Sequence, residues 1–158
     1  MFAKQKTIAI DVSPEAVYDY VSDIGRHPEW ARHRLVVSRV GEGRYESRAE
    51  VFHLEPHSVL EVETTDRPRR FSFFSNDSIA GRYRWYFDIS PDGSGSRVNY
   101  GLERLSASLA VKLLQPWLLW PTDGRGGVVT GLANIKRRLE AEAAPAAAPS
   151  PKSQPQIG

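Results

Sequence analysis

Residues 81–89 read GRYRWYFDI, and the alternation of these side chains decides the class of fold. Successive side chains of a strand point to opposite faces, so Tyr83, Trp85 and Phe87 share one face and Arg82, Arg84 and Asp88 the other. One face of the predicted strand is therefore aromatic and its reverse is charged. This pattern is typical of an antiparallel sheet that packs on one side and meets water on the other.

Period-two patterns continue on both sides of this stretch, from about residue 34 to residue 105. Short connections rich in Gly, Pro, Asn and Asp separate them, and such connections join antiparallel neighbours. The sequence predicts strands over residues 7–10, 44–54, 58–65, 69–76, 79–89 and 96–105.

Two helices are predicted to flank these strands. The first begins at Ser13, followed by a proline and a glutamate that suit a first helical turn, and is expected to end at Gly25. A short helix or turn follows over residues 26–30. The apolar stripes of the two helices are Val17, Val21 and Ile24 in the first, and Val128, Leu132, Ile135 and Leu139 in the last.

This order of elements predicts an α+β domain with helices gathered on one face of a curved antiparallel sheet. The domain is expected to span residues 1–142. Residues 143–158 are rich in Ala, Pro and polar residues, which favours a disordered tail.

Several stretches resemble one known family. IAIDVSPEAVYDY (8–20) and HPEW (27–30) are similar to the opening of the polyketide cyclase/dehydrase branch of the START-like (SRPBCC) superfamily. Residues 81–87 and 96–100 resemble its last two strands, and residues 132–140 its terminal helix. The resemblance implies a helix-grip (START/Bet-v-1-like) fold, in which the sheet wraps around a long C-terminal helix. Members bind lipids, sterols, quinones, hormones and polyketides, and some catalyse cyclisation or dehydration.

The expected ligand site lies between the aromatic sheet face and the final helix. Glycine costs about 1 kcal/mol relative to Ala in a helix interior, yet Gly124, Gly127 and Gly131 fall beside the apolar stripe. They either leave space for a ligand or permit close contact with the sheet, and the sequence does not decide between the two. The predicted ligand-binding residues are Trp30, Tyr45, Val51, His53, Phe71, Phe73, Tyr83, Trp85, Phe87, Tyr100, Val128, Gly131, Leu132 and Ile135.

His53 is the candidate for acid–base chemistry. Alternation along the predicted strand places it on one face with Tyr45 and Val51. A buried histidine of this kind either exchanges protons with a ligand or is a hydrogen-bonded structural group. Two functions follow. The first is a carrier or sensor of an apolar small molecule, and the alternative is a polyketide cyclase or dehydratase that uses His53 with Tyr83 or Tyr100.

No metal site and no cofactor are expected. His53, Glu55 and His57 alternate, but Pro56 is expected to turn the chain and separate them. The sequence contains no cysteine, which excludes thiolate metal ligands, thiol nucleophiles and disulfides. Hydrolase and phosphate-loop signatures are also missing.

Charge and hydropathy bear on partners. The formal net charge is +2, which gives no strong electrostatic reason to expect nucleic-acid binding. The N-terminus lacks the features of a secretory signal, so a cytoplasmic protein is expected. The stretch from Leu109 to Trp120 is apolar around its circumference, but shorter than the roughly 18 residues that span a bilayer. It is expected to be buried, to form a dimer contact, or to touch a membrane transiently.

Overall fold

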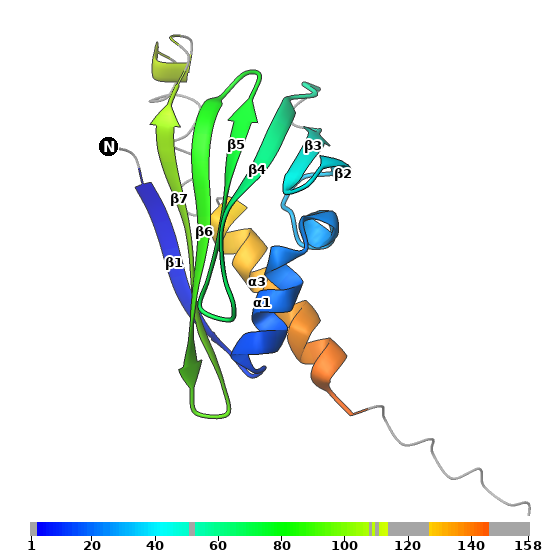
Figure 1. The fold of residues 1–158 in the computed structure, drawn as a ribbon, viewed down its shortest axis with the longest axis vertical. Coiled ribbons are helices and arrows are strands. Elements are labelled where there is room, and N and C mark those ends of the chain that lie inside the picture. Colours follow the sequence, from blue (N-terminus) through cyan, green and yellow to red (C-terminus); the bar gives the residue numbers. More distant parts are fainter. Residues whose placement is uncertain (1–2, 51–52, 108, 110, 114–126, 146–158) are drawn as a thin grey trace, which may run out of the picture.

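A computed structural model describes residues 3–50, 53–107, 109, 111–113 and 127–145 (Figure 1). In this part of the chain, seven strands form one antiparallel sheet in the order β1-β7-β6-β5-β4-β3-β2. The helical elements are α1 (Pro14–Ser22), the 3-10 helix η1 (Ile24–Glu29) and α3 (Gly127–Ala143). The strands are β1 (Ala3–Ile10), β2 (Leu35–Gly41), β3 (Arg44–Ala49), β4 (His57–Asp66), β5 (Arg70–Asp77), β6 (Gly81–Asp92) and β7 (Gly95–Ser106).

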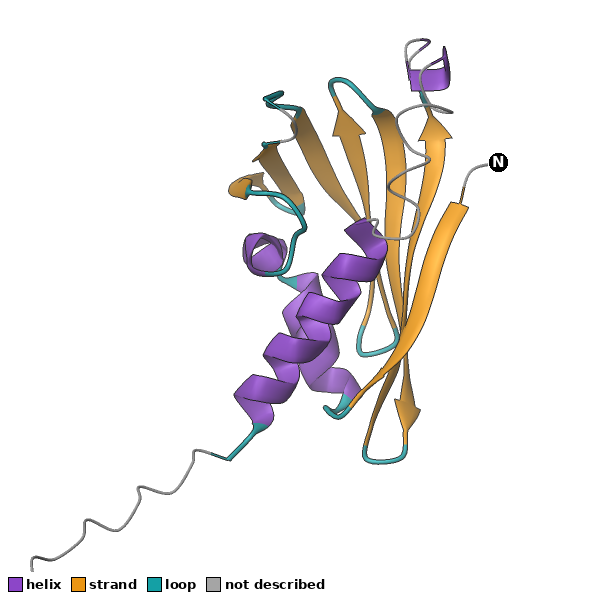
Figure 2. Ribbon diagram, turned by 180° about the vertical axis from the view of Figure 1, so that it is seen from behind, coloured by secondary structure: helices purple, strands orange, loops and turns teal. Residues whose placement is uncertain are grey.

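The domain has two layers. Both α1 and α3 lie on one face of the curved sheet, and the strands extend past the N-terminal end of α3 (Figure 2). Two contacts join α3 to the end of β1: Lys136 donates a hydrogen bond to the Ala9 carbonyl oxygen, and Glu140 accepts one from the Asp11 amide. This is the predicted α+β helix-grip architecture.

The first helix is shorter than its apolar stripe predicts. The Ser13 hydroxyl accepts a hydrogen bond from the Ala16 amide and caps α1, as expected. However, α1 ends at Ser22 rather than at Gly25, because Asp23 starts the next helix and its carboxylate accepts from the Gly25 amide. Ile24 therefore belongs to η1 and not to α1.

Several predicted strand boundaries are also wrong. The first strand, predicted over residues 7–10, begins at Ala3, and β6 ends at Asp92 rather than at residue 89. The strand predicted over residues 44–54 ends at Ala49 as β3. The strand predicted to begin at residue 79 begins at Gly81, because the Asp77 carboxylate accepts hydrogen bonds from the amides of Ile79 and Ala80 and holds them in a turn.

The register confirms the predicted aromatic face. Phe87 lies opposite Phe71 on one neighbouring strand and opposite Tyr100 on the other. Residues directly opposite each other share a face of the sheet, so the aromatic side chains of three strands converge on the helical layer. We call this the inner face.

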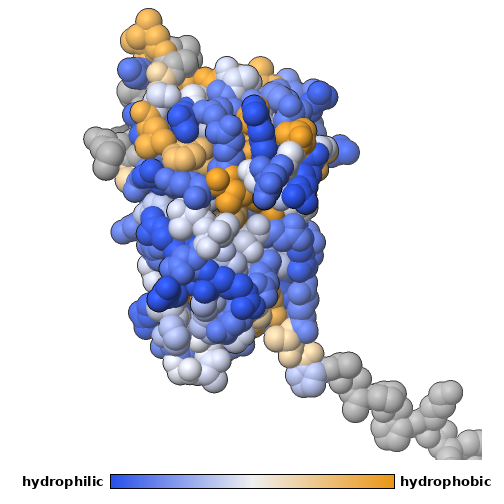
Figure 3. Space-filling model, viewed as in Figure 1, coloured by the Kyte–Doolittle hydropathy of each residue, from blue (hydrophilic) through white to orange (hydrophobic). Residues whose placement is uncertain are grey.

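The reverse of the sheet, the outer face, is polar (Figure 3). Arg84 forms ion pairs there with Glu63 and Glu103, at 2.8 and 3.3 Å. The ring of Tyr86 lies directly over Gly101, where any side chain would collide with it. None of the described helices is long and apolar enough to cross a membrane.

The predicted domain boundary at residue 142 lies one residue before the end of α3. Most of the predicted tail, from residue 146 on, lies outside the described residues. The same holds for most of the apolar stretch that ends at Trp120. Of its described members, Leu109 and Leu113 are 73% and 69% exposed.

Candidate functional site

One end of the inner face is solid. Phe87, Leu132 and Ile135 each have 0% of their surface exposed. Trp30 fills the space between α3 and the sheet: a Cβ atom on Gly131 would lie 3.2 Å from its Cε3 atom. Of the two interpretations of the glycines, close contact is therefore the one that holds at Gly131. We call this region the closed end.

Three aromatic rings separate the closed end from the rest of the inner face. Trp30 meets the ring of Tyr100 edge-on, with centroids 5.9 Å apart. Phe73 and Tyr100 stand on either side of Trp85 and stack on it, at 6.3 and 5.9 Å. Trp30, Phe73 and Tyr100 are all buried, and we call them the floor.

Beyond the floor, apolar side chains of the inner face are only partly buried. They pack against the core on one side and keep part of their surface exposed. They come from five strands, β2, β3, β4, β6 and β7, and so extend across most of the width of the sheet. We call this region the open end; its members are Val37, Tyr45, Val62, Trp85 and Leu102.

Small hydroxyl side chains line the inner face among these apolar groups. Ser47 lies opposite Ser58 across β3 and β4, Ser75 lies opposite Leu60 across β4 and β5, and all three serines are less than a tenth exposed. Ser75 accepts a hydrogen bond of 2.8 Å from the Trp85 indole, and Ser58 donates one of 2.8 Å to Asp77. The open end is therefore apolar with a polar border that includes the Asp77 carboxylate.

His27 supports the floor from below. Its ring lies against Trp30 and Phe73, with centroids 4.6 and 5.3 Å away. Burial lowers the pKa of His27 to about 4, so the imidazole is neutral at pH 7. Its Nε2 atom lies 2.9 Å from the Val21 carbonyl oxygen, which requires the tautomer with the proton on Nε2.

The tyrosines of this region keep their protons. Burial raises the pKa of Tyr100, and burial is also the largest cause of the raised pKa of Tyr83. Tyr83 donates a weak hydrogen bond of 3.4 Å to the Ala80 carbonyl oxygen. Both hydroxyls can donate a hydrogen bond to a ligand, and neither is a base at neutral pH.

The structure gathers most of the predicted ligand-binding residues but divides them between two environments. Tyr45, Tyr83 and Trp85 keep exposed surface, whereas nine other members form the floor or the solid core beneath it. The buried members of the predicted set are Trp30, Phe71, Phe73, Phe87, Tyr100, Val128, Gly131, Leu132 and Ile135.

His53 does not join this group. It is an exposed turn residue with φ of 67°, beyond the end of β3. The alternation that aligned it with Tyr45 does not apply, because the strand has already ended. Val51 lies outside the described residues.

Sequence reasoning missed several residues of the inner face. Leu102 lies two residues after Tyr100, and Val62 lies opposite Phe73. The alternation in both strands could have revealed them. Val37 offered a weaker signal, because its strand was recognised only as part of a long period-two region.

The described residues contain no group of three His, Asp or Glu side chains that could hold a metal ion. His57, at the start of β4, has its Nε2 atom 3.7 Å from a carboxylate oxygen of Glu46.

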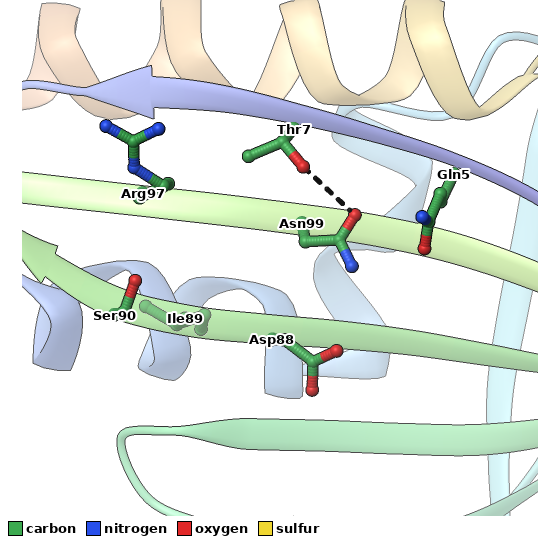
Figure 4. Close-up of a pocket in the computed structure, with 7 residues that line it drawn as sticks. All are labelled: Gln5, Thr7, Asp88, Ile89, Ser90, Arg97 and Asn99. Atoms are coloured by element: carbon green, nitrogen blue, oxygen red, sulfur yellow. Dashed lines mark hydrogen bonds between the residues drawn. The ribbon is translucent and has the colours of Figure 1, made fainter.

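A depression of about 290 Å³ lies on the outer face (Figure 4). Its polar groups already have partners: Thr7 donates to Asn99, and Arg97 and Asp88 form ion pairs with Asp92 and Arg70. Only one of its seven lining residues, Ile89, is hydrophobic, which makes it a poor candidate site for an apolar ligand. Its lining residues are Gln5, Thr7, Asp88, Ile89, Ser90, Arg97 and Asn99.

Comparison with known proteins bears on the inner face. The family model described as polyketide cyclase/dehydrase and lipid transport matches residues 1–140. The chain belongs to this family. The predicted resemblance is thereby confirmed. No curated protein is similar enough in sequence to match the chain.

Solved structures share the fold at low sequence identity. TTHA0849 from Thermus thermophilus is 24% identical with a TM-score of 0.70, over 90% of this chain and 100% of that one. A conserved protein from Geobacillus kaustophilus is 12% identical with a TM-score of 0.73, over 89% and 97%. A START superfamily protein from Mycobacterium smegmatis is 16% identical with a TM-score of 0.62, over 89% and 98%. At these identities the likeness supports the fold and not a particular ligand.

Proposed function

We propose that this protein binds an apolar small molecule at the open end of the inner face, as a carrier or sensor. The observation that carries the proposal is the set of partly buried apolar side chains next to an aromatic floor: Val37, Tyr45, Val62, Trp85 and Leu102. A lipid, a quinone or a polyketide-like compound has the matching chemistry, and family membership supports the same class of ligand.

Burial of apolar surface supplies the free energy of binding in this proposal. Each Å² of apolar surface removed from water contributes about 25 cal/mol before the costs of association. Val62 and Leu102 are only partly buried, so a ligand that covers them adds to this contribution. The open end is therefore less stable alone than when a ligand covers it.

The alternative, a cyclase or dehydratase, requires a group that takes a proton from the ligand. Among the described residues near the floor, His27 already donates a hydrogen bond to the Val21 carbonyl oxygen, and its ring packs against Trp30 and Phe73. Tyr83 and Tyr100 have raised pKa values and hold their protons. These features favour binding over acid–base catalysis.

One matched pair of variants tests the proposal. Val62 and Val59 lie on β4, and the register places Val62 opposite Phe73 on the inner face and Val59 opposite Asn76 on the outer face. Val62→Lys places an ammonium group among the apolar side chains of the open end. Val59→Lys makes the same change on the outer face of the sheet. Binding of an apolar fluorescent probe is measured by titration for both variants and the wild type.

We expect Val62→Lys to weaken binding at least tenfold and Val59→Lys to leave it unchanged. Native mass spectrometry of protein purified from its own host provides a second readout, and we expect a co-purified apolar compound. Equal affinities for the two variants would show that the probe binds elsewhere and would refute the proposed site.

A further inference from the structure

The inner face carries positive charge along one edge of the open end. That edge is made by β1 and β7, which pair at one side of the sheet (Figure 1). The register places Lys4 opposite Leu102 and Lys6 opposite Tyr100. Because Leu102 and Tyr100 belong to the inner face, both lysines lie on that face as well.

Arg104 lies on the same face of β7, two residues after Leu102. It is opposite Tyr83 of β6, whose side chain is on the inner face. The register of these two strands shifts only beyond Tyr83, so the irregularity does not move Arg104 to the other face. We call these three residues the basic edge: Lys4, Lys6 and Arg104.

The three cations lie close enough together to act on one ligand group. Lys4 and Arg104 are diagonal neighbours across the strand pair, and such residues lie about 7–8 Å apart, within reach of long side chains. Lys6 follows Lys4 on the same face of β1 at about 7 Å. Lys4 and Arg104 are half-buried, whereas Lys6 is exposed.

The charge of Arg104 acts on the inner face itself. Burial raises the pKa of Tyr83, and the Arg104 guanidinium opposes that rise. The guanidinium therefore lies near enough to the Tyr83 hydroxyl to affect its ionisation. Leu102 of the open end lies between Arg104 and the floor residue Tyr100 along β7.

Acidic side chains do not balance this charge on the same strands. Within the described residues of β1, β6 and β7, no inner-face position is acidic, and Glu103 and Asp88 form their ion pairs on the outer face. Asp77 of β5 is an inner-face acid, but its carboxylate already accepts hydrogen bonds from the Ser58 hydroxyl and two backbone amides. The basic edge is therefore a region of excess positive charge beside an apolar surface.

We propose that the ligand is an amphiphile with an anionic group, a carboxylate or a phosphate ester, which the basic edge binds while the apolar part covers the open end. This inference rests on the proposed function and makes Lys4, Lys6 and Arg104 the residues that determine specificity. Partial burial strengthens the attraction, because the effective dielectric constant is lower there than in water. Hydrogen bonds from a guanidinium or an ammonium group to an anion are also the stronger class.

The test compares decanoate with decanol, which share a chain and differ in the charge of the head group. Each displaces the apolar fluorescent probe at pH 7, and the ratio of their affinities is measured for the wild type, Arg104→Gln and Lys6→Gln. Arg82→Gln is the matched control, because it removes the same charge from the outer face of β6, where the guanidinium lies 4.5 Å from the centre of the Phe74 ring. The ratio cancels the apolar contribution of the shared chain.

We expect the wild type to prefer decanoate, and added salt to reduce that preference through screening. Arg104→Gln should lower the decanoate-to-decanol ratio at least fivefold, Lys6→Gln should lower it by a smaller factor, and Arg82→Gln should leave it unchanged. An unchanged ratio in Arg104→Gln, with both compounds still bound, would overturn the anion contact and leave the apolar site standing. Failure of both compounds to bind the wild type would overturn the proposed site and this inference together.

Two further arms identify the source of the anionic group. Decyl phosphate that binds more tightly than decanoate would support a phosphate ester, and the reverse order would support a carboxylate. Sedimentation with phosphatidylcholine vesicles that contain phosphatidylglycerol tests a membrane surface instead. Loss of vesicle binding in Arg104→Gln and Lys6→Gln, with an unchanged decanoate-to-decanol ratio, would assign the basic edge to a membrane and overturn the proposal.

Discussion

The closed and open ends of the inner face use the same residue types for different purposes. At the closed end, Phe87 stacks on Tyr100 with centroids 4.3 Å apart, and helices cover it completely. At the open end, Trp85 belongs to the same strand and the same face, yet it keeps exposed surface. The two positions are two residues apart in the chain.

This difference shows that exposure, and not residue type, distinguishes a core from a candidate site here. Trp30 lies at the border between the two ends, because its ring fills the space next to Gly131 on α3. We expect stability to reside mainly at the closed end and ligand affinity at the open end. Four measurements test this division.

The largest effect is expected at Phe87. Phe87→Ala removes a fully buried ring and leaves a cavity, which should lower the free energy of unfolding by about 3–5 kcal/mol. Val62→Ala at the open end should cost less than about 1.5 kcal/mol, because its side chain is only partly buried. Urea denaturation measures both, and similar losses would remove the distinction between the two ends.

The next largest effect is a dependence of the free energy of unfolding on pH, caused by His27 beneath the floor. The pKa of His27 is about 4 in the folded protein, below the ordinary value of 6.5, so the unfolded chain takes up the proton first as the pH falls. The contribution of neutral His27 to the free energy of unfolding is fully present above pH 6.5. Between pH 6.5 and 4 the free energy of unfolding should fall by about 1.4 kcal/mol per pH unit.

Replacement of His27 isolates this contribution. Urea denaturation at several pH values should show a flatter dependence for His27→Gln than for the wild type. His53→Gln serves as the control, because His53 is exposed. If His27→Gln showed the same dependence of the free energy of unfolding on pH as the wild type, that dependence would come from other groups.

A smaller effect is expected at the glycines of α3. In Gly131→Ala the new methyl group would lie 3.2 Å from Trp30, which His27, Phe87 and Tyr100 hold in place. Overpacking should outweigh the helix-propensity gain of about 1 kcal/mol, for a net loss of about 1 kcal/mol. Gly127→Ala is the control, since among the described residues outside its own helical turn no atom lies within 4 Å of its added methyl group. Stabilisation of Gly131→Ala by thermal denaturation would mean that Trp30 has room to move.

The smallest effect is expected at the open end. Ser75→Ala removes the acceptor of the Trp85 indole, but that side chain is partly exposed, so water can replace the hydroxyl. We expect a loss of about 0.5–1 kcal/mol in urea denaturation. A loss above about 2 kcal/mol would show that water cannot reach Trp85 and that the open end is closed.

Sequence periodicity predicted much of the fold because it depends on local geometry. The alternation over residues 81–89 assigned Tyr83, Trp85 and Phe87 to one face, and the register confirms it. The spacing of the last apolar stripe predicted the buried face of α3 in the same way. The errors fall where a side chain redirects the backbone, as the carboxylates of Asp23 and Asp77 do. Periodicity carries no information about such hydrogen bonds.

The sequence by itself determined which side chains share a face, because the repeats of a strand and a helix are fixed by their backbones. Only the tertiary structure decided which of them are covered. Trp30 and Tyr100 are distant in the chain, and their contact with Gly131 depends on how η1, β7 and α3 pack together. That packing closed one end of the inner face, left the other partly exposed, and buried the Trp30 indole N–H group without a partner among the described residues.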